Sequence, residues 1–138
     1  MTDTPTRKPS RRSPAVKLRR AVLEDVPAIF AVQLAAYAGH PASRLFTERN
    51  FQMQIDAFPE GQAVALIKGE IIGYAMSLIV HLDDDSPWHN YNEITAAGSF
   101  ATHDPGAETL YGADMCVHPK HRGQGVAQRL YSARMRIM

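Results

Sequence analysis

A short basic loop near the end of the chain has the composition of a phosphate-binding site. It follows an apolar stretch that ends at Val117, and it leads directly into a helical pattern that begins after Gly125. The loop reads, in order, His118, Pro119, Lys120, His121, Arg122, Gly123, Gln124 and Gly125. Backbone amides at a helix N-terminus carry the positive end of the helix dipole, and glycines let an anion approach them closely. The sequence therefore predicts a cradle for phosphate oxygens, to which Arg122 can add a charge-assisted hydrogen bond.

Two common glycine motifs do not fit this loop. A dinucleotide-binding fingerprint needs Gly or Ala where Gln128 stands, and a Walker loop needs Gly-Lys followed by Ser or Thr. The spacing of Arg122, Gly125 and Ala127 instead resembles the acetyl-CoA loop of the GNAT superfamily of N-acyltransferases, R/Q-x-x-G-x-G/A. Residues 115–119 are similar to that superfamily's fourth strand and its exit, and the resemblance covers residues 16–138.

This resemblance implies an N-acyltransferase that moves an acetyl group from acetyl-CoA, its co-substrate, to an amine by direct attack. It implies that backbone groups of Met115, Cys116 and Val117 pair with the pantetheine arm and the acyl carbonyl. It also implies that six consecutive residues hold the pyrophosphate through their amides, namely Gly123, Gln124, Gly125, Val126, Ala127 and Gln128. The alternative is a catalytically silent CoA-binding or interaction module, a fragment of a larger acyltransferase and amidohydrolase protein.

Attack on a thioester needs a neutral amine, and free amines have pKa values of about 8 to 10.4, so a base is required. Asp114 is the leading candidate because it lies on the strand beside the acyl site that the resemblance implies. Glu93 and His118 are the reserves. The alternative for Asp114 is a solvated strand carboxylate or a structural hydrogen-bond acceptor. Cys116, a lone cysteine in a strand, is expected to be a small core residue rather than a nucleophile.

Histidines and aspartates gather in the long segment of residues 81–108. They are His81, Asp83, Asp84, Asp85, His89, His103 and Asp104. No His-x-x-x-His spacing supports a metal site, and acidic runs are usually solvated, so we predict no metal. The acidic run favours, by long-range steering, a cationic acceptor, either a small-molecule or a peptide amine.

The order of apolar patterns predicts a single domain in which these residues are positioned by strands and helices. We expect a partly exposed strand at residues 16–22, helices at 25–37 and 47–58, strands at 63–67 and 71–80, a short helix at 91–97, a strand at 109–117 and a helix from 125. Asp25 is expected to cap the first helix, and residues 39–41 to end it. With the resemblance, this order implies an α/β fold of the α+β type, with a mixed, mainly antiparallel sheet flanked by helices.

The last strand and the segment before it carry two further expectations. Strict alternation predicts that Leu110, Gly112, Asp114 and Cys116 share one face of the sheet. The 28 residues of segment 81–108 are unusually long for a connection in a compact domain, which favours a lid or a binding loop. Trp88 is expected to anchor this segment against the core.

A narrower resemblance is to the acyltransferase half of bifunctional proteins that join a GNAT domain to a carbon–nitrogen hydrolase domain. It rests on residues 59–62, 77–80, 88–89, 92–94, 103–105 and 109–112. The strand, helix and final strands that follow the last helix in the superfamily have no counterpart in residues 16–138. We therefore expect a domain that is incomplete at its C-terminus, with a homo-oligomer or a second chain as the source of the missing part.

Composition sets the remaining expectations. Seven of the first 20 residues are Lys or Arg, against Asp3 alone, although the whole chain has a net charge of only +1. Residues 1–15 are therefore expected to be a flexible basic tail, with nucleic-acid contact or an organellar transit role as the lesser alternatives. The longest apolar run spans ten residues, against about 20 for a membrane helix, so no membrane partner is expected. The single cysteine, Cys116, points to a reducing cytoplasm.

Overall fold

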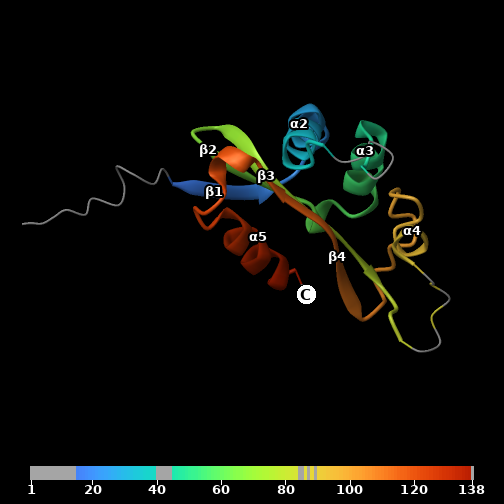
Figure 1. Cartoon of the computed structure of the whole chain (residues 1–138). Coiled ribbons are helices and arrows are strands. Elements are labelled where there is room, and N and C mark those ends of the chain that lie inside the picture. The colour runs from blue at the N-terminus through green and yellow to red at the C-terminus, as the bar shows by residue number, and fades with distance from the viewer. Residues whose placement is uncertain (1–14, 40–44, 84–85, 87, 89, 138) are drawn as a thin grey trace, which may run out of the picture.

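Four antiparallel strands form a sheet with helices on both of its faces (Figure 1). The computed structural model describes residues 15–39, 45–83, 86, 88 and 90–137, so most of the predicted basic tail lies outside the described residues. The elements in chain order are β1 (Val16–Arg20), η2 (Leu23–Asp25), α2 (Val26–Ala36), α3 (Glu48–Ala57), η4 (Pro59–Gly61), β2 (Ala63–Ile67), β3 (Glu70–Val80), α4 (Tyr91–Ile94), β4 (Thr109–Val117), η5 (Pro119–His121) and α5 (Val126–Met135). The strand order is β1-β2-β3-β4, so β4 lies at one edge of the described sheet.

The core consists of two apolar layers, one on each face of the sheet. Helices α2 and α3 cover one face, where Ile29 and Phe51 pack in one buried cluster with Tyr74 of β3. Helix α5 covers the other face, where Leu130 packs with Ala75. Because both faces are covered, β3 is buried along almost its whole length. Within the described residues, no helix is both long enough and apolar enough to span a bilayer.

Local hydrogen bonds set the starts of the first two long helices. Thr47 Oγ1 accepts from the Asn50 amide at 3.0 Å, and Asn50 Oδ1 accepts from the Thr47 amide at 2.9 Å, a reciprocal cap that begins α3 where the sequence predicts it. The prediction that the Asp25 side chain caps α2 is wrong. Its carboxylate instead forms two bonds with the Arg19 guanidinium, at 2.7 and 2.9 Å, and accepts from the Val22 amide at 2.9 Å. Asp25 therefore closes the turn between β1 and α2.

A buried glutamine extends the β2 ladder beyond the end of the strand. The last β2–β3 pair is Ala63 with Ala75. Further along β3, Ser77 donates its amide to Gln62 Oε1 at 2.8 Å, and its carbonyl accepts from Gln62 Nε2 at 2.8 Å. Gln62 Nε2 also donates to the carbonyl of Phe58 at 2.9 Å. The fully buried Gln62 amide thus replaces strand backbone at the point where β2 stops.

A β-bulge in β4 changes which side chains share a face of the sheet. Met76 pairs with Asp114, but the next residue of β3, Ser77, pairs with Gly112, so Ala113 is an extra residue. The predicted strict alternation is therefore wrong between residues 112 and 114. A Cβ on Gly112 would point at α5, whereas the Asp114 carboxyl bonds to Tyr74 in the core beneath α2 and α3.

The second half of the connection between β3 and β4 folds back onto the domain. Phe100 is completely buried in the core beneath α3. Gln54 Nε2 donates to the carbonyl of Gly98 at 2.9 Å. His103 Nδ1 accepts from the Ile79 amide at 3.0 Å, and its ring stacks on Phe58 with the ring centroids 4.1 Å apart. The described residues from 90 to 108 therefore form a packed part of the domain. The length of the connection had instead favoured a lid or a binding loop.

The sequence also predicts a short helix and a tryptophan contact in this connection. The predicted helix at residues 91–97 is a single turn that ends at Ile94, because Ala96 and Ala97 have φ values of 52° and 58°. Trp88 Nε1 donates to the carbonyl of His81 at 2.8 Å. Trp88 thus anchors the connection to its own beginning and belongs to none of the three buried clusters, whereas the sequence predicts an anchor against the core.

Replacing Gln62 with leucine should test the ladder extension. Gln62→Leu leaves the buried amide and carbonyl of Ser77 without their partners, so we expect the free energy of unfolding to fall by about 2–4 kcal/mol. Urea denaturation monitored by circular dichroism measures this change. Gln52→Leu on the partly exposed side of α3 is the control and should shift it by less than about 0.5 kcal/mol. Equal stabilities of the two variants would contradict the structural role given to Gln62.

Candidate functional site

The loop of residues 118–125, which we call the phosphate loop, forms a small hollow at the N-terminus of α5. The hollow encloses about 130 Å³ and is lined by Val117, His121, Arg122, Gly123, Gly125, Val126, Ala127 and Gln128. Gly123 and Gly125 both have a φ of 79°, a conformation that other residues rarely adopt. A Cβ at either position would meet no other atom within 4 Å. The two glycines are therefore required by the path of the backbone rather than by lack of space.

Two side chains at this loop are bonded to the protein's own backbone. Arg122 Nη2 donates to the carbonyl of Ala36 at 3.4 Å, which ties the phosphate loop to the C-terminal end of α2. His118 Nδ1 accepts from the Lys120 amide at 3.1 Å and so caps η5. The structure thus places His118, a reserve candidate for the base, as a cap at the exit of β4.

The edge of β4 beside the phosphate loop carries backbone groups that no described strand pairs. The His118 amide donates to the carbonyl of Ile72 at 2.8 Å. Hydrogen-bonded pairs alternate along an antiparallel ladder, so the backbone of Cys116 faces β3, while that of Met115 and Val117 faces the edge. Of the three residues predicted to pair with a pantetheine arm, Met115 and Val117 therefore turn their backbone groups to the edge, and Cys116 does not. The Met115 amide also interacts with the Asp114 carboxyl.

Asp114 lies at the bulge and bonds to two neighbouring side chains. The Tyr74 hydroxyl donates to Asp114 Oδ2 at 2.7 Å, and Cys116 Sγ lies 3.6 Å from Asp114 Oδ1. Burial raises the pKa of Asp114, against the opposing effect of these hydrogen bonds. Burial also raises the pKa of Tyr74, and it raises the pKa of Cys116 to about 12. At neutral pH both neighbours are protonated donors, and the carboxyl is the member of this trio that can change its charge.

The Asp114 carboxyl opens onto a cavity of about 370 Å³ between α2 and the bulge, which we call the Asp114 cavity. Its lining residues are Gln33, Tyr37, Leu45, Phe46, Tyr91, Ala113 and Asp114. The Tyr91 hydroxyl donates to the carbonyl of Ala113 at 2.7 Å, which fixes that ring against the bulge. The Gln33 amide donates to the Phe46 carbonyl at 2.8 Å and accepts from the Phe46 amide at 3.0 Å. The cavity walls are therefore held in place by hydrogen bonds on both sides.

Arg134 of α5 supports the bulge from the other face of the sheet. Its Nη2 donates to the backbone carbonyl of Asp114 at 3.2 Å, and its positive charge opposes the rise in the pKa of that carboxyl. A Cβ on Gly112 would lie 2.1 Å from Arg134 Nη1, so a larger residue there would displace the Arg134 guanidinium from the bulge. Sequence reasoning missed Arg134, as it missed Tyr74 and Tyr91. A glycine inside a strand was the available signal, because it marks a close approach.

Glu93, the other predicted catalytic residue, is not brought together with Asp114. It is exposed on α4, and it is not one of the residues that line the Asp114 cavity. Tyr91, two residues earlier in the same turn, is the α4 residue that reaches the bulge. The structure therefore favours Asp114 over Glu93 as a group that can meet a ligand in this cavity.

His81, at the start of the connection, pairs with two acidic side chains near its end. His81 Nδ1 lies 2.7 Å from Glu108 Oε1, and His81 Nε2 lies 3.4 Å from Asp104 Oδ2. The hydrogen bond with Glu108 raises the pKa of His81. In the described part of the chain, no group of three or more His, Cys, Asp or Glu side chains is arranged so that it could hold a metal ion. Asp84, Asp85 and His89 lie outside the described residues.

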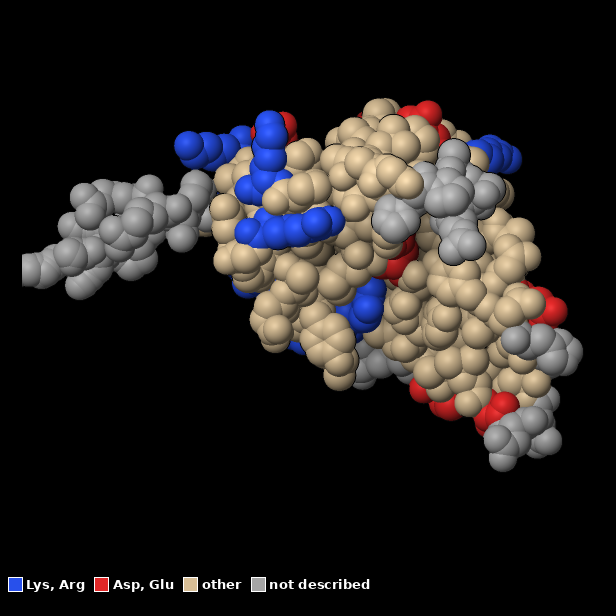
Figure 2. Space-filling model, viewed as in Figure 1, with Lys and Arg blue, Asp and Glu red and all other residues tan. Residues whose placement is uncertain are grey.

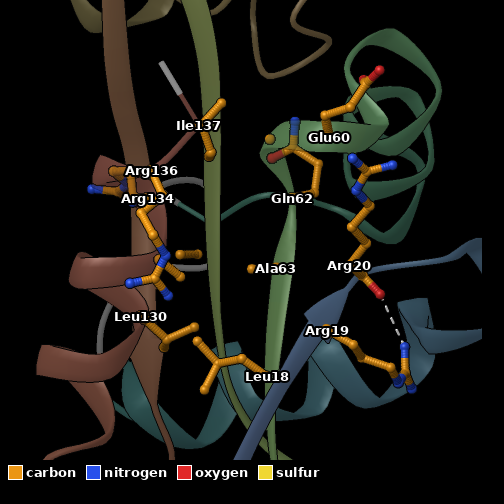
Figure 3. Close-up of a pocket in the computed structure, with 13 residues that line it drawn as sticks. Leu18, Arg19, Arg20, Glu60, Gln62, Ala63, Leu130, Arg134, Arg136 and Ile137 are labelled. Atoms are coloured by element: carbon orange, nitrogen blue, oxygen red, sulfur yellow. Dashed lines mark hydrogen bonds between the residues drawn. The ribbon is translucent and has the colours of Figure 1, made fainter.

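A second hollow, of about 250 Å³, lies on the face of the sheet that α5 covers (Figure 3). Apolar side chains such as Leu18 and Leu130 line it, and Arg20, Arg134 and Arg136 stand around it. It is on the opposite face from the Asp114 cavity. Arg134 is the residue that both lines this hollow and bonds to the bulge.

Charges are unevenly distributed over the surface (Figure 2). Lysines and arginines gather at the end that carries β1 and β2, and acidic side chains gather toward the end of the β3–β4 connection. Exposed Asp83, Asp104 and Glu108 belong to that connection. Such a distribution attracts anions to one end of the molecule and cations to the other.

The buried thiol gives a direct chemical test of the site's packing. Cys116 is only 4% exposed and has a pKa of about 12, so about one thiol in ten thousand is ionised at pH 8. We expect native protein to react with the disulfide reagent DTNB at least about a thousandfold more slowly than protein unfolded in urea. The chain has one cysteine, so absorbance at a single wavelength follows one residue. Equal rates in the two states would mean that Cys116 is exposed and ionised.

Comparisons of sequence place this chain among acetyltransferases. The Acetyltransferase (GNAT) family model matches residues 26–138. The uncharacterized N-acetyltransferase YkwB of Bacillus subtilis (strain 168) is 34% identical over 121 residues, which are 87% of this chain and 54% of YkwB. The probable hydrolase YhcX of the same organism is 32% identical over 117 residues, which are 85% of this chain and 22% of YhcX. The chain thus spans about half of the first relative and a smaller part of the second.

Comparison of structures agrees with the sequence relationships. The loading GNATL domain of CurA from Lyngbya majuscula superposes with a TM-score of 0.74 at 15% identity, covering 88% of this chain and 57% of that one. At this identity the likeness shows the fold alone, and it confirms the predicted GNAT-like fold, an antiparallel sheet flanked by helices. From the matched family model and the identity to YkwB, the chain belongs to the GNAT acetyltransferase family.

Proposed function

We propose that this chain is an N-acyltransferase that moves an acetyl group from acetyl-CoA to an amine at the bulged edge of β4. One observation carries the proposal. A partly buried carboxyl, Asp114, lies beside the edge-facing strand backbone of Met115 and Val117, and that strand leads directly into the glycine turns at the N-terminus of α5. This arrangement places three features next to one another along the chain: a titratable carboxyl, a strand edge that can form hydrogen bonds, and a possible anion site at a helix N-terminus.

Acetyl-CoA would lie along the edge of β4, from the phosphate loop to the bulge. The amides of residues 123–128 are the proposed partners of the pyrophosphate, because they lie at the positive end of α5. The edge-facing backbone groups of Met115 and Val117 are the proposed partners of the pantetheine arm. Arg122 has a smaller role in this proposal, because its guanidinium already bonds to Ala36.

The proposed chemistry is direct attack of a neutral amine on the thioester carbonyl. The C–N bond forms as the C–S bond breaks, and the amine proton passes to a base while the departing CoA sulfur takes a proton from solvent. Asp114 is the proposed base. Burial raises its pKa toward the working pH, where a general base is most effective. Asp114 also lines the cavity in which an acceptor has room. No metal is required for this reaction.

A second candidate is a CoA-binding module without transferase activity. Free-thiol release distinguishes the two candidates. The module would bind CoA, but it would release no free thiol from acetyl-CoA in the presence of amines.

Replacing one glycine of the phosphate loop with alanine tests whether CoA binding depends on the backbone conformation of the loop. Gly125→Ala forces a strained φ where the amides must point at the ligand, so we expect CoA affinity to fall at least about tenfold by isothermal titration calorimetry. Arg122→Ala should cost less, about two- to fivefold.

The control for this experiment is Gly69→Ala at the β2–β3 turn. Gly69 has the same φ of 79° and the same free space around a Cβ, so its local strain is matched. We expect Gly69→Ala to lose similar stability and to keep CoA affinity within twofold. A severe loss in Arg122→Ala with none in Gly125→Ala would contradict the backbone cradle.

Removal of the proposed base should lower turnover and alter its pH dependence. Wild-type kcat should rise as pH increases through the raised pKa of Asp114, because the ionised form takes the proton. Asp114→Asn should lower kcat about 100-fold or more, keep CoA affinity within twofold and abolish that rise.

Free-thiol release over pH 5–9 measures these values with an amine in excess. Glu93→Gln is the comparison that tests the reserve candidate for the base. If Asp114→Asn keeps the wild-type profile and Glu93→Gln loses it, the base is Glu93 and Asp114 is structural.

A further inference from the structure

The hollow on the face of the sheet that α5 covers, which we call the arginine hollow, is lined by both cationic and apolar side chains. Arg20 lies at the end of β1, and Arg134 and Arg136 lie at the C-terminal end of α5. Apolar surface comes from the same two elements, through Leu18 of β1 and Leu130 of α5. Figure 3 shows Arg20 and Arg134 on opposite sides of the hollow. The fold thus surrounds one apolar space with positive charges from distant parts of the sequence.

These three arginines have no acidic partner among the described residues. The ion pairs in that part of the chain involve Arg19 and His81 only. Arg19 also lines the hollow, but its two terminal nitrogens bond to the Asp25 carboxylate at 2.7 and 2.9 Å. Glu60, which is exposed, is the only acid among the described lining residues. The arginine hollow therefore carries three unpaired positive charges and one negative charge.

Arg134 is partly buried, and one of its nitrogens lacks a hydrogen-bond partner. Its Nη2 donates to the carbonyl of Asp114 at 3.2 Å, whereas its buried Nε donates to no described atom. Burial lowers the pKa of Arg134, and the charge of Asp114 opposes that effect. A buried charged group with an unpaired donor is unfavourable, so an anion that approached this guanidinium would stabilise its charged form.

The lining of the hollow favours a small anion that carries an alkyl chain. Planar guanidinium groups match the two oxygens of a carboxylate, and the apolar side chains can cover a chain attached to it. The negative end of the α5 dipole amounts to about half a charge, so the neighbouring arginines outweigh it. The hollow encloses about 250 Å³, slightly below the range of about 300–1,000 Å³ for drug-sized ligands. The ligand must therefore be small.

We propose that the arginine hollow binds a small alkyl carboxylate, with the charged group held by the arginines and the alkyl chain against Leu18 and Leu130. This site shares no lining residue with the phosphate loop or with the Asp114 cavity, so it is independent of the proposed function. Arg134 is the one side chain that connects it to the bulge, through the carbonyl of Asp114.

Binding of matched probes tests the proposal. Hexanoate, hexanol and hexylamine share a chain length and differ in charge, and acetate keeps the charge without the chain. NMR titration of the full chain, followed at the amides of Ala63 and Ala133, measures binding in the hollow itself. We expect hexanoate to bind at least about tenfold more tightly than hexanol and than acetate, with hexylamine the weakest of the four. Equal affinities for hexanoate and hexanol, or shifts confined to residues 123–128 of the phosphate loop and α5, would overturn the proposal.

Two exposed arginines can be removed without breaking a contact to a described residue. Neither Arg20 nor Arg136 uses its side chain in such a hydrogen bond or ion pair, so we expect the double variant Arg20→Gln/Arg136→Gln to fold. It should weaken hexanoate binding at least about tenfold and leave hexanol within twofold. Arg129→Gln is the control, because Arg129 is an exposed arginine of α5 that does not line the hollow. An equal loss in Arg129→Gln would indicate a general effect of net charge and would overturn the site.

A change of shape gives a second, charge-neutral test. Ala133 is partly exposed and lines the hollow, so Ala133→Phe should fill the space and abolish the binding of hexanoate and hexanol together. Unchanged hexanoate binding in Ala133→Phe would place the ligand elsewhere. A second copy of the chain is the competing occupant. Shifts of the hollow amides with protein concentration alone, accompanied by a dimer in analytical ultracentrifugation, would assign the hollow to that copy and overturn the carboxylate site.

Discussion

The single extra residue in β4 decides on which face of the sheet the Asp114 carboxyl lies. Ala113 interrupts the pairing with β3, and the Asp114 side chain consequently meets Tyr74 beneath α2 rather than lying with Gly112 toward α5. A bulge also releases backbone groups from the ladder, and they need other partners. Here the Ala113 carbonyl is bound by Tyr91 from one layer, and the Asp114 carbonyl by Arg134 from the other. The bulge is therefore held from both faces of the sheet.

Asp114 is largely buried, and opposing effects act on its pKa. Burial alone favours the protonated acid, whereas the Tyr74 hydroxyl, the Cys116 thiol and the more distant Arg134 charge favour the carboxylate. None of these partners neutralises it by a direct ion pair. Asp25 differs, because its direct ion pair with the Arg19 guanidinium lowers its pKa.

Local patterns were sufficient to predict most elements, because their causes are local. The Thr47 cap, the turn at Lys68 and Gly69 with φ values of 52° and 79°, and the strands on either side of it follow from residue types a few positions apart. The bulge, the role of Asp25 and the choice of Tyr91 over Glu93 could not be predicted in this way. Each depends on a partner brought close by tertiary packing, as with Arg134 against Gly112, 22 residues earlier. The predicted roles of the phosphate loop and of Asp114 in ligand binding remain predictions.

The hydrogen bond of Trp88 to His81 has a practical consequence for spectroscopy. Trp88 is the only tryptophan of the chain, and its indole is held within the connection rather than against the phosphate loop or the Asp114 cavity. Intrinsic fluorescence of this protein therefore reports the state of the β3–β4 connection. A change in emission on addition of a ligand indicates that this segment has repacked, and constant emission is compatible with a fully occupied site.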